Sequence, residues 1–385
     1  SDVYKRQLPT LWSSIAMSNN ENNYSDYFKS LEKRISAEKS SAPKTYVPQK
    51  SPKKKSSLYK VIRLRPAFVF CFAAAVIMAV SALAIHNKGQ AKAQTLPQDS
   101  GKSGVLRSVS DKKDEKKISY SFNAESAAIP DTNDAAGAII VNLDNHCVVA
   151  SRAAHTRLYP ASTTKILTLL TAAENITDYE ETFTMTRSIT DPLYVAEATV
   201  AGFSDGEKVK MIDLLYGTIL PSGADAAMGL AVKLTGSEEG LVKLMNEKVK
   251  ALGLKDTHFT NVTGLYDEDH YTTAYDMAVI LEAALENPIC KKVLSTYQYT
   301  TAATEQHPDG ILLSATLFNY MYGTEPETAT IEGGKTGFVN EAGYCIASYG
   351  SNNETGTRYI VVTLKNSSRW PAFYGQIDLY KQFAK

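Results

Sequence analysis

The stretch Pro160-Ala161-Ser162-Thr163-Thr164-Lys165 comes directly before an apolar run with the spacing of one helix face. This spacing predicts a buried amphipathic helix with Ser162 in its first turn. There, unpaired backbone N–H groups and the positive end of the helix dipole favour a developing oxyanion. Lys165 follows three residues later, on the same face. A serine with a lysine in reach is what serine/lysine acyl transfer requires. The apolar run is Ile166, Leu169, Leu170 and Ala173.

The Ser-x-x-Lys spacing by itself is a weak signal. Further copies lie in polar, Lys- and Ser-rich stretches, and only the copy at Ser162 begins an apolar helix. The alternative interpretation of that copy is a plain helix start with a solvent-facing lysine. The remaining copies begin at Ser30, Ser36, Ser41, Ser51, Ser57 and Ser110.

Two further motifs follow Ser162 along the chain. Residues 220–225 read Leu-Pro-Ser-Gly-Ala-Asp and form a loop that enters a helix, with Ser222 at its centre. Residues 333–337 read Gly-Gly-Lys-Thr-Gly and are predicted to lie on a strand, where the glycines let another backbone approach closely. Ser-x-x-Lys, a Ser-x-Asn-type element and Lys-Thr-Gly occur together in penicillin-binding proteins and class A β-lactamases.

On these motifs, residues 133–385 resemble serine D-alanyl-D-alanine carboxypeptidases, the low-molecular-mass penicillin-binding protein family. The resemblance implies an α/β fold, in which an antiparallel sheet is flanked by helices and an all-helical subdomain forms the other wall of a cleft, as in β-lactamases and DD-peptidases. The likeness extends to residues 159–162 (Tyr-Pro-Ala-Ser), 261–265 (Asn-Val-Thr-Gly-Leu), 270–278 (His-Tyr-Thr-Thr-Ala-Tyr-Asp-Met-Ala), 335–338 (Lys-Thr-Gly-Phe) and 342–344 (Ala-Gly-Tyr).

The resemblance also implies a reaction and roles for individual residues. The expected substrate is the pentapeptide stem of peptidoglycan, which loses its terminal D-alanine, and β-lactams are expected as covalent inhibitors. No cofactor or metal is expected. A neutral Lys165 needs a lowered pKa, which burial and a second cation, Lys335, would supply. The implied roles are nucleophile for Ser162, general base for Lys165, proton relay for Ser222, carboxylate binding for Lys335 and Thr336, and oxyanion-hole N–H groups from Ser162 and Phe338.

One position departs from the family pattern, because Ala224 stands where the Ser-x-Asn element has its asparagine. The amide that would contact the bound peptide is therefore missing. Three alternatives stay open on the same scaffold: an endopeptidase, a β-lactamase, and a non-enzymatic penicillin-binding sensor or scaffold. Residues 264–275 contain no Glu-x-x-x-Asn element to supply a deacylating base, which argues against a β-lactamase.

Different chemistries fit the sequence less well. His270 lies near Asp269 and Asp276, and we interpret it as a capped loop histidine. The histidines form no metal-binding pair with a nearby Asp or Glu, which argues against a zinc peptidase. The sequence has no phosphate-binding glycine loop. Its four cysteines include no Cys-x-x-Cys pair, so each is expected to act as a small buried apolar residue.

The charge is divided unevenly along the chain. Residues 1–65 carry 14 Lys and Arg against 5 Asp and Glu, a net +9, and because the whole chain has 41 of each, the remainder carries a net −9. An apolar segment at residues 66–85 follows this tail and is long enough to span a bilayer core as a helix. We therefore expect a disordered cytoplasmic tail rather than a nucleic-acid-binding arm. Residues 1–16 are expected to be non-native, with Met17 as the start.

The apolar segment at residues 66–85 predicts a single-pass signal-anchor in the cell membrane. The flanking Arg63 and Arg65 place the following chain outside the cytoplasm by the positive-inside rule. A cleaved signal peptide is the alternative, since residues 91–93 resemble a cleavage site, but the apolar region is longer than usual for one. Residues 86–132 are expected to form a flexible stalk, and residues 133–385 the catalytic domain.

Local patterns predict the elements of that domain. A β-hairpin is expected at 137–151 and a β-rich stretch at 182–210. Helices are expected at 210–219, 225–234 and 238–252, the last capped by Ser237, and at 274–286, capped by Thr273. Strands are expected at 330–335, 344–349 and 358–365, and a final helix at 372–383.

Overall fold

The computed structural model describes residues 117–321, 323–324 and 326–385. The predicted basic tail, the segment at 66–85 and most of the stalk lie outside these residues. Within the described part, no helix combines the length and apolar character that crossing a bilayer requires. The anchor at residues 66–85 therefore stays a prediction.

The main sheet has six strands in the order β1-β3-β2-β10-β9-β8. Neighbouring strands are antiparallel, except that β1 runs parallel to β3. The predicted hairpin at 137–151 is confirmed as β2 and β3. The strands of this sheet are β1 (Ala127–Ala128), β2 (Gly137–Asn142), β3 (Cys147–Arg152), β8 (Ala329–Val339), β9 (Gly343–Asn352) and β10 (Arg358–Asn366).

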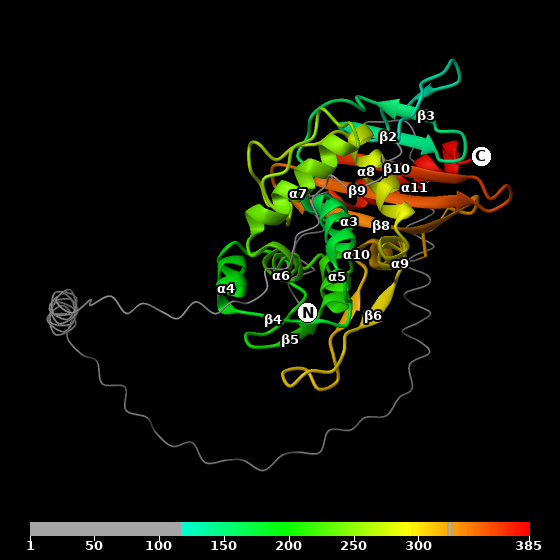
Figure 1. Ribbon diagram of the computed structural model, residues 1–385. Coiled ribbons are helices and arrows are strands. Elements are labelled where there is room, and N and C mark those ends of the chain that lie inside the picture. The colour runs from blue at the N-terminus through cyan, green and yellow to red at the C-terminus, as the bar shows by residue number, and fades with distance from the viewer. Residues whose placement is uncertain (1–116, 322, 325) are drawn as a thin grey trace, which may run out of the picture. The chain divides into compact units, whose positions relative to one another are not determined.

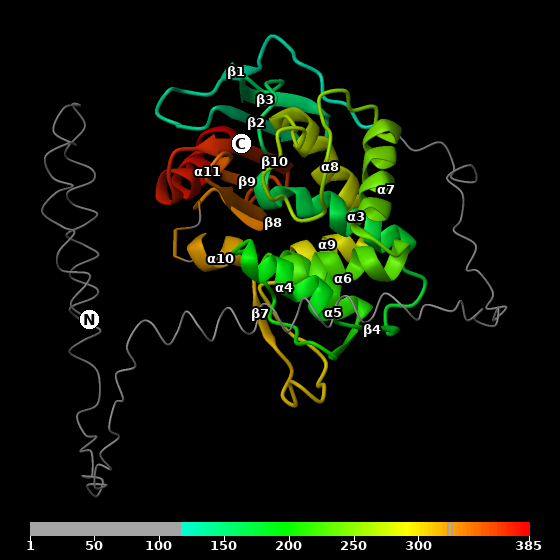
Figure 2. The same ribbon diagram turned by 90° about the vertical axis from the view of Figure 1, so that its left-hand side faces the viewer.

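Helices cover both faces of the sheet, with α3 (Lys165–Asn175) and α8 (Ala274–Glu286) on one and α11 (Arg369–Phe383) on the other (Figure 2). Because side chains alternate along a strand, β10 contributes to two cores. Val362 packs in the core under α3 and α8, whereas Val361 packs in the core under α11. The sheet is thus the middle layer of a mixed α/β fold.

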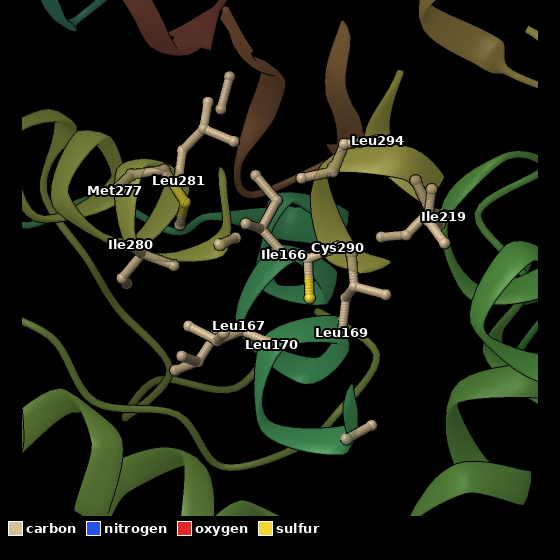
Figure 3. Close-up of a cluster of buried hydrophobic side chains, with 14 of the residues drawn as sticks. Ile166, Leu167, Leu169, Leu170, Ile219, Met277, Ile280, Leu281, Cys290 and Leu294 are labelled. Carbon is tan, nitrogen blue, oxygen red and sulfur yellow. The ribbon is translucent and has the colours of Figure 1, made fainter. Parts of the chain in front are cut away.

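A helical part lies beside the sheet, next to α3 (Figure 1). Figure 3 shows Ile166 and Leu169 of α3 among side chains of its neighbours, including Ile219, Leu281 and Cys290. Every residue of α3 from Lys165 to Ala173 is buried, so this helix is enclosed on all sides. The remaining helices are α4 (Arg187–Val195), α5 (Met211–Ile219), α6 (Ala224–Thr235), α7 (Glu238–Ala251), α9 (Pro288–Leu294) and α10 (Thr316–Met321).

The domain begins earlier in the chain than the predicted boundary at residue 133. Ile118 and Tyr120 are buried in the core, and the Tyr120 hydroxyl donates a hydrogen bond to Glu282 on α8 at 2.5 Å. Ser121 also forms a parallel bridge with Cys147. Residues 117–132 are therefore part of the globular unit and not of a stalk. The polar composition of this stretch did not show it, because only a few apolar side chains make the contacts with the core.

The stretch predicted as β-rich at 182–210 is mostly not a sheet. Its strands are β4 (Thr182–Thr184) and β5 (Lys208–Lys210), and α4 lies between them. Ile189 and Leu193 of α4 are four residues apart and bury one face of the helix. Pro192 and the surrounding threonines hid this pattern.

The caps at Ser237 and Thr273 are confirmed, since their hydroxyls accept from the N–H groups of Gly240 and Asp276. A small pair, β6 (Gln298–Thr300) with β7 (Leu312–Ser314), was not predicted.

Candidate active site

Ser162 lies in a 3₁₀ turn, η3 (Ala161–Thr164), that leads into α3. Ala161 has a left-handed backbone with φ of 48°, which costs an L-residue about 1–2 kcal/mol. Two buried hydroxyls hold the turn in this shape: Thr163 donates to the Pro160 carbonyl at 2.7 Å, and Thr164 donates to the Ala161 carbonyl at 2.8 Å. The turn around Ser162 is therefore fixed by its own side chains.

Lys165 is the first residue of α3, and its side chain is only 2% exposed. Its Nζ lies 3.0 Å from Ser162 Oγ and 2.6 Å from the Thr263 carbonyl oxygen. Burial lowers the pKa of Lys165 to about 7, although the charge of Asp225 acts to raise it. A substantial share of Lys165 is thus neutral near neutral pH and within reach of the serine proton.

The Thr263 carbonyl is aimed at Lys165 by a tight loop. The Asn261 side-chain oxygen accepts from the backbone N–H groups of Thr263 and Gly264 at 3.1 and 2.7 Å. Gly264 has φ of 82°, and a Cβ there would lie 2.0 Å from the Ala161 oxygen. Only glycine allows this loop to lie so close to the nucleophile turn.

Strand β8 lies on the other side of the same turn. A Cβ on Gly337 would lie 2.7 Å from the Ser162 nitrogen. Lys335, 2% exposed, donates from Nζ to the Thr336 carbonyl at 2.7 Å. Burial, followed by repulsion from Lys165, lowers the pKa of Lys335 well below its usual value. Burial is thus the main cause of the lowered pKa of both lysines. From the sequence, we expected repulsion from Lys335 to help lower the pKa of Lys165 as well.

Phe338 lies on β8, which is an edge strand of the main sheet. It follows Thr336 by two residues, so its backbone N–H and C=O point to the same side as the Thr336 carbonyl, which accepts from Lys335 Nζ. The Phe338 ring is half-exposed and stacks on Tyr344 with ring centroids 4.3 Å apart. The backbone N–H of Phe338 therefore lies on the strand edge that carries Lys335 Nζ.

Ser222 lies in the loop between α5 and α6 and has φ of 70°. Its side chain is nearly buried, and among the described residues its hydroxyl has no hydrogen-bond partner. The N–H of Gly223 donates to the Gly217 carbonyl at 2.9 Å. The buried carboxylate of Asp225 accepts backbone N–H groups of Ala201, Gly202 and Phe203. The loop and its neighbouring segment are thus held by a backbone hydrogen bond and by the Asp225 carboxylate, and the Ser222 hydroxyl takes no part.

Ala224, the position that departs from the family pattern, begins α6 and is 2% exposed. Its N–H donates to the Thr199 carbonyl at 2.8 Å. The methyl group packs in the main core, so the position is closed to solvent.

The geometry unites the predicted residues Ser162, Lys165 and Lys335 around one turn, with the strand of Thr336 and Phe338 alongside. Sequence reasoning missed the Thr263 carbonyl, the Asn261 side chain and the Asp225 carboxylate as supports of this site. An Asn three residues before a Gly could have indicated the turn at 261–264. No pattern of neighbouring residues, however, indicates that this turn contacts Lys165.

A model of the D-alanyl-D-alanine carboxypeptidase family matches residues 123–368, well over half of the chain. The chain is 32% identical over 222 residues to D-alanyl-D-alanine carboxypeptidase DacF of Bacillus subtilis, covering 56% of this chain and 54% of that protein. It is 30% identical over 220 residues to DacA of Escherichia coli, covering 55% of this chain and 51% of that one. The matched part thus spans about half the length of these two relatives.

Among solved structures, the fold is similar to the Streptomyces K15 DD-transpeptidase, with a TM-score of 0.58 and 28% identity. The match covers 64% of this chain and 97% of that one. The mixed α/β architecture of the sheet and its helices is therefore that of a DD-peptidase.

Proposed function

Because this chain belongs to the D-alanyl-D-alanine carboxypeptidase family, we propose that it removes the C-terminal D-alanine from peptidoglycan stem peptides through a Ser162 acyl-enzyme. β-Lactams acylate the same serine in this proposal. The observation that carries it is the contact of 3.0 Å between Lys165 Nζ and Ser162 Oγ, made by a lysine whose pKa is lowered to about 7. A serine activated in this way is a nucleophile near neutral pH.

In the proposed acylation, Ser162 Oγ attacks the carbonyl carbon between the two D-alanines while Lys165 takes the serine proton. The C–N bond then breaks, and Ser222 passes a proton to the leaving amine, which departs as D-alanine. Water hydrolyses the resulting ester and regenerates Ser162. The unpartnered hydroxyl of Ser222 supports the relay role, because among the described residues no group engages it.

Lys335 and Thr336 are proposed to bind the terminal carboxylate of the peptide. A carboxylate beside Lys335 would favour its charged form and offset the burial that lowers its pKa. The N–H groups of Ser162 and Phe338 would bind the oxyanion. The close approach of Gly337 to the Ser162 nitrogen supports this pairing, since it brings the strand edge to the nucleophile.

We further propose that residues 66–85 anchor the protein in the cell membrane with the catalytic domain outside the cytoplasm. The apolar length and the flanking Arg63 and Arg65 support this orientation. Protease added to intact cells from outside should digest the catalytic domain and spare residues 17–60. Protection of the domain with loss of the tail would refute the orientation.

The structural neighbour from Streptomyces K15 is a DD-transpeptidase by name, which favours a second candidate outcome for the same acyl-enzyme. An amine of a second peptide could attack the acyl-enzyme in place of water. The products would then be two joined peptides in place of one hydrolysed peptide. The same fold could also support an endopeptidase or a non-catalytic sensor or scaffold. Each of these functions involves acylation or binding at Ser162, and they differ in the fate of the bound group.

The test uses diacetyl-Lys-D-Ala-D-Ala with and without a glycine-type amine, together with labelled penicillin. A carboxypeptidase releases D-alanine and yields the hydrolysed peptide, and a transpeptidase diverts product to the amine adduct. Penicillin labelling without any release of D-alanine would support the sensor. The absence of both labelling and release would refute the proposed function.

A further inference from the structure

His270 is a buried histidine that the proposed mechanism does not use, and it lies against the nucleophile turn. Its side chain is enclosed, and the residue is 2% exposed. Nδ1 lies 3.1 Å from the backbone nitrogen and 3.3 Å from the side-chain oxygen of Thr260, and Nε2 lies 2.8 Å from Thr164 Oγ1. The Phe259 ring and the imidazole pack in a T-shaped arrangement, with ring centroids 5.1 Å apart. Both ring nitrogens therefore have fixed partners.

These partners determine where the imidazole proton resides. The Thr260 N–H can only donate, so Nδ1 accepts and carries no proton. A neutral imidazole then has its proton on Nε2 and donates to Thr164 Oγ1. This leaves the Thr164 hydroxyl proton free for the Ala161 carbonyl at 2.8 Å. With Nδ1 as an acceptor, the Thr260 hydroxyl at 3.3 Å is a further donor to it. The chain of hydrogen bonds then runs in one direction, from His270 through Thr164 to Ala161.

The end of this chain controls an atom of the site. The Ala161 carbonyl belongs to the same peptide plane as the Ser162 N–H, because peptide bonds are planar. Fixing the direction of the carbonyl therefore fixes the direction of that N–H. Ala161 needs such support, since its left-handed φ of 48° is unfavourable for an L-residue.

We propose that His270 is a positioning residue: as the neutral Nε2–H tautomer it orients, through Thr164 and the Ala161 carbonyl, the Ser162 N–H that binds the oxyanion. The inference rests on the proposed acyl-transfer function of Ser162. Burial lowers the pKa of His270 to about 4, helped by the charges of His258 and Lys165 and opposed by Asp267. The imidazole is thus neutral wherever Lys165 is able to act as a base.

Two substitutions at one position separate the roles of the two ring nitrogens. His270→Asn keeps an acceptor near Nδ1 for the Thr260 N–H and removes the donor to Thr164. His270→Gln keeps a donor near the Nε2 position. We expect penicillin acylation to slow by about tenfold to a hundredfold in the Asn variant and by no more than about threefold in the Gln variant, because one oxyanion donor supports about 10²–10³ in rate. Equal rates in the two variants would overturn the proposal.

Thr164→Val should slow acylation as much as His270→Asn, because it cuts the same chain. For the peptide, kcat should fall with KM nearly unchanged, as expected for a contact made in the transition state. Thr218→Val is the matched control, since the buried Thr218 hydroxyl also donates to a carbonyl, that of Leu214 at 2.8 Å, and takes no part in the chain. It should leave the rate within about twofold of the wild type.

The double variant Thr164→Val/His270→Asn tests whether the two residues act in series. Acylation should be no more than about twofold slower than in the slower single variant, since the second change removes nothing further. Rate losses that multiply would show independent effects and refute the chain.

A direct observation on the wild type does not depend on activity or on the folding of any variant. Nitrogen NMR of the full protein should show His270 as the Nε2–H tautomer, without titration from about pH 5 to 8. A proton on Nδ1, or a midpoint near the usual histidine pKa, would overturn the inference. If the tautomer is as expected and the wild type is not acylated by penicillin, the proposed function fails while the hydrogen-bond chain stands.

Discussion

Two turns in this domain place a serine at or beside a left-handed backbone, and the two are held in different ways. At the Ser162 turn, hydroxyls of Thr163 and Thr164 bond to the carbonyls of the turn, and Lys165 contacts the serine itself. At the Ser222 turn, backbone bonds and the Asp225 carboxylate hold the neighbouring segments, while the serine hydroxyl has no partner among the described residues.

This difference fits two separate tasks. A nucleophile benefits from a base already in contact, whereas a relay needs a hydroxyl that is free to meet a group from outside the protein. The strain is also placed differently. Ala161 carries the left-handed backbone before Ser162, but Ser222 carries it at its own position. Substitutions at the two turns should therefore change activity and stability in different proportions.

The largest effect is expected for Ser162→Ala, which removes the nucleophile. Labelled penicillin should no longer attach to the protein, and D-alanine release should cease, because no other group forms the acyl-enzyme. Peptide mapping by mass spectrometry should find the wild-type adduct on Ser162. An adduct on Ser222 would reverse the assignment of the two turns.

Lys165→Arg should rank next, because a guanidinium keeps the charge and cannot act as a base near neutral pH. We expect acylation to slow by about 10²–10⁴-fold. In the wild type, the acylation rate should rise with pH through about 7 and then level off, since the neutral lysine is the active form. Rapid-mixing measurements of acylation across pH test both points. An arginine variant within tenfold of the wild type would mean that Lys165 acts only through its charge.

At the second turn, Ser222→Ala and Ser222→Gly should both reduce kcat for the peptide by about a hundredfold through loss of the relay. Their stabilities should differ, because glycine removes the cost of the φ of 70° at this residue. Ser222→Gly is expected to gain about 1 kcal/mol in free energy of unfolding relative to Ser222→Ala, measured by urea denaturation. Unchanged turnover in both variants would remove Ser222 from the mechanism.

The smallest effect on activity is expected for Ala224→Asn, which restores the family residue beside the second turn. Penicillin should still label Ser162, and kcat/KM for the peptide should change by no more than about tenfold. Because Ala224 is buried, the larger side chain should lower the free energy of unfolding by about 1–3 kcal/mol. Thermal and urea denaturation measure that loss. An inert wild type that gains turnover in this variant would favour the sensor interpretation.

Much of the fold could be predicted because its signals are local. The caps at Ser237 and Thr273 and the alternation in the 137–151 hairpin each depend on residues a few positions apart. The helix α4 was missed since its two buried residues, Ile189 and Leu193, are too few for a clear period. The helices α9 and α10 were missed for the same reason, because they are short.

Ser162, Lys165 and Lys335 could be proposed from the sequence because three motifs occur together along the chain, although the Ser-x-x-Lys spacing by itself is weak. The supports of these residues were not predictable, because the Thr263 carbonyl and the His270 ring reach the turn from a loop about a hundred residues further along the chain. No local pattern reports such contacts. From the sequence, His270 was interpreted as an ordinary loop histidine beside aspartates. The structure shows that both of its ring nitrogens have hydrogen-bond partners.

The order of strands in the main sheet has a consequence for how the chain folds. Strand β2 pairs with β10, joining Val141 to Ile360 across more than two hundred residues. The β2–β3 hairpin can form as soon as it is synthesised, but β10, the other neighbour of β2, is the last of the six main-sheet strands along the chain. Closing so long a loop has an entropy cost, and folding slows as native contacts join residues further apart in the sequence. A growing chain that ends before residue 358 would hold Ser162, Lys165 and Lys335 without the strand that links β2 to β9 in the finished sheet.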